Sequence, residues 1–88
     1  MDFSQRINQL QIDNPDRLLM VTIYDRPRDF PKHFIARASL TGRKGIEQTG
    51  YFIRANTLEA LQAKMSKFGL YWVGRHEQDE PHIVGGWI

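Results

Sequence analysis

The stretch "HFIARASLTGRKGIEQTGYFIRA", His33 to Ala55, decides the fold of this chain. Its first part alternates, so one face of an extended strand would carry four apolar side chains, Phe34, Ala36, Ala38 and Leu40. The tetrapeptide "GRKG" places glycines on both sides of two basic residues, a hairpin-type connection to the second apolar run "IEQTGYFIRA". Hairpin neighbours pair antiparallel, so the stretch predicts two adjacent strands of an antiparallel sheet.

The next stretch, "NTLEALQAKMSKFG", predicts an amphipathic helix from Asn56 to Gly69. Asn56 is the expected N-cap with Glu59 three residues later, and Gly69 is the expected C-cap. Two basic residues near the end complement the helix dipole. The apolar positions recur at helical spacing and are Leu58, Leu61, Met65 and Phe68.

The flanking segments complete an α+β fold. The β-branched run "LLMVTIY", Leu18 to Tyr24, predicts a strand, and "LYWVGRH" and "HIVGGWI" around the polar "EQDEP" predict a second hairpin. Apolar residues at positions 3, 7 and 10 predict a short N-terminal helix ended by "DNPD". We therefore expect one domain, residues 1–88: a mainly antiparallel sheet of about five strands, in the order β-β-β-α-β-β, with the amphipathic helix on one face.

Composition excludes several classes of protein. The 88 residues carry a net charge of +2, with twelve basic and ten acidic residues whose signs alternate, so nucleic-acid binding is permitted but not indicated. The chain has no cysteine, which excludes disulfides, thiolate metal sites and a cysteine nucleophile. No segment resembles a signal peptide or reaches membrane-spanning length, so we expect a cytoplasmic protein without a membrane partner.

No pattern in the sequence predicts catalysis, a cofactor or a metal. The serines lack a nucleophile elbow, and "GRKGIEQTG" lacks phosphate-loop spacing. His76 and His82 flank three acidic residues, but a four-residue hairpin loop would turn the two imidazoles to opposite faces, and only a five-residue loop would bring them together. A solvated acidic hairpin tip is the favoured interpretation.

Aromatic residues near arginine offer candidate binding surfaces. With the four-residue loop, Trp72 and Trp87 would sit opposite each other, with glycines leaving open space beside their rings. A core role is favoured, but an exposed tryptophan near Arg75 would make a protein-binding anchor. The stretch "TGYFIRA" is faintly similar to the aromatic strand of an RNA-recognition motif, whose exposed rings stack on bases, but it lacks the leading basic residue, the second glycine and the spacing of that motif, and the order of strands and helices differs. Whichever of Tyr51 and Phe52 faces inward is expected in the core, and a base-stacking platform is not the favoured interpretation.

The segment "YDRPRDFPKHF", Tyr24 to Phe34, cannot be helical, because its two prolines restrict their own backbone and that of the preceding residues. We expect a stiff strand-to-strand connection whose Phe30 is anchored in the core. Asp25 and Asp29 are expected to pair with the basic residues of the same segment. A pre-ordered charged loop of this kind is a candidate contact surface.

The pattern "TIYDRPRDFPKHFIAR", Thr22 to Arg37, resembles a strand-loop-strand signature, of the type YDxPxDxPxxFxxR, found in small uncharacterised proteins of bacteria and their phages. That group has no assigned activity. The resemblance therefore implies a bacterial or phage setting, in which a phage-encoded inhibitor or modulator of a host system is one expectation, and it transfers no catalytic residue.

Two functions follow as hypotheses. The favoured one is a non-enzymatic binding or regulatory domain that contacts a protein partner through the segment Tyr24 to Phe34, here called the proline segment, and through the sheet face away from the helix. A homodimer through a sheet edge is a further expectation. The alternative is nucleic-acid binding through the basic loops around Arg26, Arg28 and Lys32 and around Arg43 and Lys44. The candidate partner-binding residues are Arg26, Arg28, Lys32, Arg43, Lys44, Trp72, Arg75 and Trp87.

Overall fold

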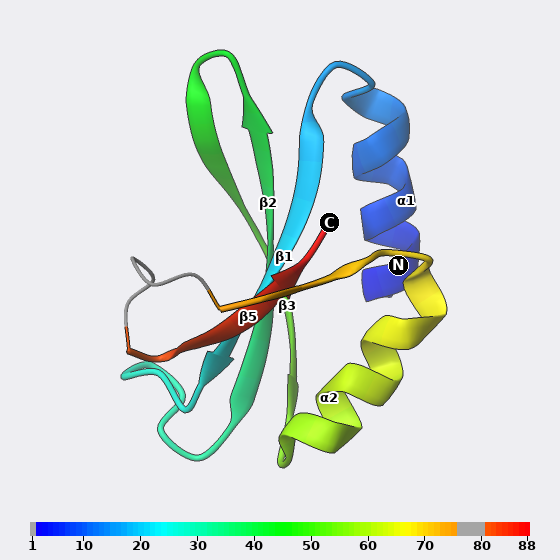
Figure 1. Ribbon diagram of the computed structural model, residues 1–88. Helices are drawn as coiled ribbons and strands as arrows, with labels where there is room; N and C mark the ends of the chain where they lie inside the picture. Colours follow the sequence, from blue (N-terminus) through cyan, green and yellow to red (C-terminus); the bar gives the residue numbers. More distant parts are fainter. Residues whose placement is uncertain (1, 76–80) are drawn as a thin grey trace.

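The computed structural model describes residues 2–75 and 81–88, and it confirms the predicted α+β fold (Figure 1). One five-stranded sheet has the order β3-β2-β1-β5-β4, and all neighbouring strands are antiparallel. The elements along the chain are α1 (Phe3–Asp13), β1 (Leu18–Asp25), β2 (Phe34–Gly42), β3 (Gly45–Ala55), α2 (Leu58–Met65), a 3-10 turn (Ser66–Phe68), β4 (Trp72–Gly74) and β5 (Ile83–Trp87).

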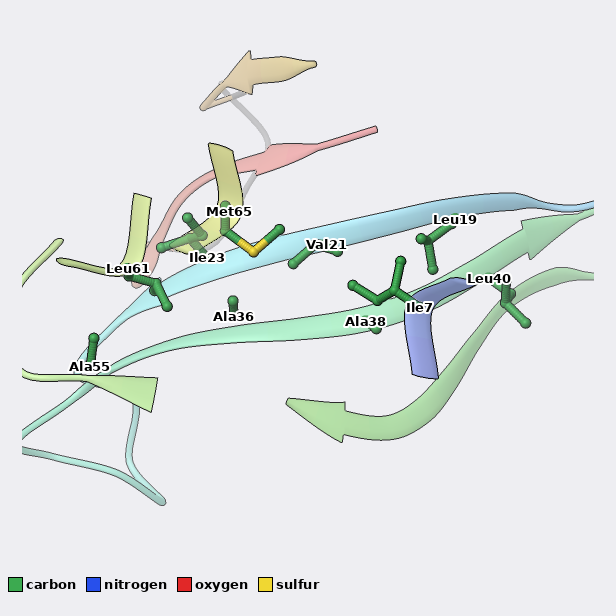
Figure 2. Close-up of a cluster of buried hydrophobic side chains, with 10 residues drawn as sticks. All are labelled: Ile7, Leu19, Val21, Ile23, Ala36, Ala38, Leu40, Ala55, Leu61 and Met65. Atoms are coloured by element: carbon green, nitrogen blue, oxygen red, sulfur yellow. The ribbon is translucent and has the colours of Figure 1, made fainter. Parts of the chain in front are cut away.

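Both helices lie on the same side of the sheet (Figure 1). Ile7 of α1 and Leu61 and Met65 of α2 are buried against the strands. The strands contribute alternate residues to this core, as the sequence predicts, and Figure 2 shows them beside the three helix residues. The buried strand residues are Leu19, Val21, Ile23, Ala36, Ala38, Leu40 and Ala55.

The helix ends differ in one respect from the prediction. Thr57, not Asn56, is the N-cap of α2: its hydroxyl accepts a hydrogen bond from the backbone N–H of Ala60 at 3.1 Å. The helix therefore begins one residue later than expected, and the capping box forms instead at α1, between Asp2 and Gln5. The left-handed backbone of Gly69, with φ of 70°, ends the helical segment as predicted.

The predicted N-terminal helix is present and has eleven residues, whereas α2 has eight. Together they cover one face of the sheet, and no helix of the described residues lies on the other face, whose strand residues are therefore candidates for a binding site. Across residues 2–75 and 81–88, neither helix is long and apolar enough to span a membrane.

Candidate functional site

The face of the sheet turned away from the helices, here called the open face, is defined by strand register. Leu18 pairs with Thr41, which pairs in turn with Ile46, so these three residues share one face, opposite to Leu19 and Leu40 of the core. Toward the other edge of the sheet, on the same face, Thr22 of β1 pairs with Gly86 of β5, and Gly86 pairs with Val73 of β4. The open face therefore extends over all five strands.

Exposed apolar side chains gather on the open face. Ile46 is 65% exposed and Val73 is 46% exposed. Tyr71 and Ile88 exchange two backbone hydrogen bonds of 2.8 and 2.9 Å, which continue the β4–β5 ladder and place both side chains on this face. We call this set the bare surface: Leu18, Ile46, Tyr71, Val73 and Ile88.

The proline segment folds over part of the rest of the open face. Phe30 does not enter the core as expected; its ring packs on Phe52 of β3, with centroids 5.2 Å apart. Pro27 is buried, and Ile35, which points to the open face, is fully buried as well. Two backbone hydrogen bonds, from Phe30 to Pro27 and from His33 to Phe30, fold the segment into consecutive turns. The predicted strand-to-strand connection therefore also covers part of the open face.

A cavity of about 320 Å³ lies between this cover and β3. A bulge opens it: β3 places residues 49–51 opposite the single residue Ala38, and Gly50 adopts a φ of 83° that glycine tolerates. The Thr49 hydroxyl donates to the Ala38 carbonyl and accepts from the Tyr51 N–H, which holds the bulge in shape. The cavity is lined by Tyr24, Pro27, Asp29, Arg37, Ala38, Gln48, Gly50, Tyr51 and Phe52.

The charged groups of the cavity neutralise each other. Arg37 donates to the Asp29 carboxylate, and this hydrogen bond lowers the pKa of Asp29 below its ordinary value. The same guanidinium lies over the Tyr24 ring, 5.5 Å from its centroid. The Arg37 Nε is buried and has no hydrogen-bond partner within residues 2–75 and 81–88. The expectation that Asp29 pairs inside its own segment is therefore wrong, because its partner comes from β2.

The predicted basic candidates lie in two separate places. Arg26 pairs with Asp25 at 2.6 Å, as expected, and Arg28 and Lys32 are exposed in the proline segment that precedes β2. Arg43 and Lys44 are exposed in the hairpin turn that follows β2. The nine residues of β2 separate the two groups by about 30 Å at 3.3 Å per residue. They do not form one patch.

The two tryptophans are directly opposite, as predicted, with ring centroids 5.4 Å apart in an edge-to-face arrangement. Both lie on the helix side of the sheet, because Trp87 pairs with Val21, and Trp87 packs against the core. The expected open space is wrong at Gly85, since a Cβ there would lie 2.6 Å from the Trp72 ring. The Trp72 ring therefore packs over Gly85 of β5 and is not held free for a partner, as the anchor hypothesis required. Arg75, just beyond β4, is exposed.

The metal hypothesis rests partly on residues 76–80, which lie outside the described residues. Among the residues that the structure describes, no group of three or more histidine, aspartate or glutamate side chains could hold a metal ion.

Sequence reasoning missed the cavity because its lining comes from three separate segments. Two signals pointed toward it. Gly50 interrupts a strand pattern, which is typical of a bulge, and Arg37 is a charged residue in the middle of a half-buried strand.

The outward ring of "TGYFIRA" is Phe52, whereas Tyr51 packs on the core with Arg6 over its ring.

Comparison with known proteins returned no match to a family model, to a curated protein or to a solved structure. The resemblance of Thr22 to Arg37 to small bacterial and phage proteins stays a prediction.

Proposed function

We propose that this protein is a non-enzymatic binding domain that contacts a protein partner through the open face of its sheet. The observation that carries the proposal is the bare surface: five exposed apolar side chains on the one face that neither helix covers. Single exposed apolar residues are common, but a set that shares one sheet face is typical of an interaction site.

The chemistry of the bare surface indicates an apolar partner. None of its five residues is charged. In the strand pairing, Thr41 lies between Leu18 and Ile46, and Gly86 lies between Thr22 and Val73. Covering a side chain of valine or isoleucine size contributes about 1.5–3 kcal/mol when burial is complete. Because these residues are only partly exposed, each contributes a fraction of this on burial, and the sum must offset about 4–15 kcal/mol of lost translational and rotational freedom, so several of them have to be buried together.

The test is affinity capture with paired variants. Ile46→Lys and Val73→Lys each place a charge on the bare surface, and we expect both to abolish capture of the partner. Ile12→Lys is the matched control, because Ile12 is 71% exposed but lies on α1. Loss of capture by Ile12→Lys, or retention by both surface variants at unchanged melting temperature, would contradict the proposal.

The proline segment is tested separately. The double variant Arg26→Glu, Arg28→Glu reverses two exposed charges. If the segment shares the contact, this variant weakens capture with only a small fall in melting temperature, because the lost pair of Arg26 with Asp25 is exposed. Unchanged capture would mean that the segment lies outside the contact. Light scattering of the wild-type protein at high concentration shows whether the partner is a second copy of the chain; Ile46→Lys and Val73→Lys then yield monomers.

A further inference from the structure

The cavity under the proline segment combines features that the protein-binding proposal does not use. It lies on the open face, has a volume of about 320 Å³ and is lined by aromatic rings and by polar groups that both donate and accept hydrogen bonds. Small-molecule sites start at about 300 Å³ and have this mixed character.

We propose that this cavity binds a nucleotide unit, with the base in the cavity and the phosphate at the basic residues around its rim. The ring of Phe52 is 43% exposed and stands at the wall of the cavity, where a planar base can stack on it. Phe30 packs on Phe52 at 50° between ring planes and fixes its orientation. The stacking platform is therefore ordered before a ligand arrives.

The polar lining matches the edge of a base. Gln48 offers an amide that donates and accepts, Asp29 a carboxylate that accepts, and Arg37 a guanidinium whose Nε lacks a partner in the described part of the chain. The bulge at residues 49–51 also interrupts the β2–β3 ladder beside the cavity. A buried donor without a partner is costly, and a base carbonyl or ring nitrogen would satisfy it after a small side-chain movement.

Charge distribution favours a nucleotide over an acidic peptide. Arg37 and Asp29 neutralise each other in the lining of the cavity, so a carboxylate that entered would be repelled by Asp29, whereas a neutral base can donate a hydrogen bond to it. The excess positive charge is at the rim: Arg54 follows Phe52 on the same face of β3, and Arg28 and Lys32 are exposed in the adjacent segment. Neither of these last two forms an ion pair with a described residue. A nucleotide has a neutral base and an anionic phosphate, so its base suits the neutral cavity and its phosphate suits the basic residues around the cavity.

The experiment is a fluorescence anisotropy titration of labelled eight-nucleotide single strands of DNA and RNA at low salt. We expect saturable binding that Phe52→Leu weakens about tenfold or more, because leucine keeps the contact with Phe30 but removes the stacking ring. Ile46→Leu, on the same strand and the same face but outside the cavity, is the matched control and is expected to bind like the wild type.

The rim is tested through salt dependence. Arg54→Gln should reduce the slope of log Kd against log salt by about 0.7, the value for one phosphate contact on a single strand. Arg43→Gln, in the distant hairpin turn, should leave the slope unchanged.

Competition distinguishes the two sources of the nucleotide. Displacement of the strand by free mononucleotides supports a site for the free ligand, and displacement only by unlabelled strands supports a nucleic-acid site; both support nucleotide recognition. Three results would overturn it: no binding at 50 mM salt, equal affinity of Phe52→Leu and the wild type at equal melting temperature, or displacement by polyglutamate as effective as by an unlabelled strand.

Discussion

The two faces of the sheet are made from alternate residues of the same strands, yet they are covered in different ways. The helix face is closed by the apolar side chains of α1 and α2, with Ile7, Leu61 and Met65 buried. The open face is closed only in part, by the proline segment, through Phe30, Pro27 and the pair between Asp29 and Arg37. The helices form a hydrophobic core with the sheet. The proline segment, by contrast, is held by ring packing and an exposed ion pair, and it leaves a cavity and the bare surface uncovered.

Truncation of the helix-face core should have the largest effect. Leu61→Ala removes a fully buried side chain between α2 and the strands, and we expect a loss of about 2–5 kcal/mol in the free energy of unfolding. Urea unfolding followed by tryptophan fluorescence measures it. Ile46→Ala on the bare surface is the comparison and should change stability by less than about 0.5 kcal/mol. Equal losses would mean that the open face is covered in solution.

The next variant asks whether the proline segment packs like a core. Ile35 is fully buried although it lies on the open face, directly after that segment in the chain, and Ile35→Ala should cost about 2 kcal/mol, at the low end for such truncations, because a loop can collapse into the space more readily than a helix. The same urea experiment applies. A loss below about 0.5 kcal/mol would show that the segment is not closed over the sheet.

Two paired glycines of the β4–β5 hairpin, Gly74 and Gly85, test how closely the Trp72 ring packs on the helix face of the sheet. A Cβ at Gly85 would lie 2.6 Å from the Trp72 ring and 2.9 Å from the Val73 carbonyl oxygen, whereas Gly74 has nothing within 4 Å. Gly85→Ala should therefore destabilise the protein by about 1–3 kcal/mol and alter tryptophan fluorescence. Gly74→Ala should do neither, and the opposite ranking would refute the placement of Trp72 over Gly85.

The smallest effect concerns the ion pair that fastens the proline segment. Arg37 lowers the pKa of Asp29, so the pair stabilises the folded protein above the ordinary aspartate pKa, and this contribution is lost as the pH falls through the lowered value. Asp29→Asn should lower the melting temperature slightly at pH 7 and by less at pH 3. Asp16→Asn is the control, because Asp16 is an exposed aspartate outside the segment. A difference that grows toward low pH would contradict the pairing.

The sequence predicts the strands, both helices and the antiparallel hairpins well, because each depends on spacing within one segment. Phe34, Ala36, Ala38 and Leu40 alternate, and they face the helices as expected. The helix cap was misplaced by one residue, since Asn56 and Thr57 can both cap a helix and only the backbone geometry distinguishes them. The partner of Asp29 was assigned to the wrong segment, because proximity in sequence does not determine which arginine a folded loop reaches.

The candidate site could be predicted only in fragments. The basic residues near Arg26 and Arg43 are obvious in the sequence, but the structure separates them by the length of β2. The cavity was not foreseen, because Tyr24, Arg37 and Phe52 belong to three strands and approach one another only after the sheet has formed.

By itself, the sequence determined the elements of this protein and which side chains of a regular strand share a face, since periodicity is a local property that the backbone converts directly into faces. It left open which of Tyr51 and Phe52 faces the core, because the bulge beside them breaks the alternation. Only the tertiary structure decided where the proline segment lies. Its position depends on Phe30 meeting Phe52 and on Asp29 meeting Arg37 across the sheet. These contacts join the segment to two strands, β2 and β3, and their free energy outweighs the entropy of an extended loop only after the strands have been brought into register.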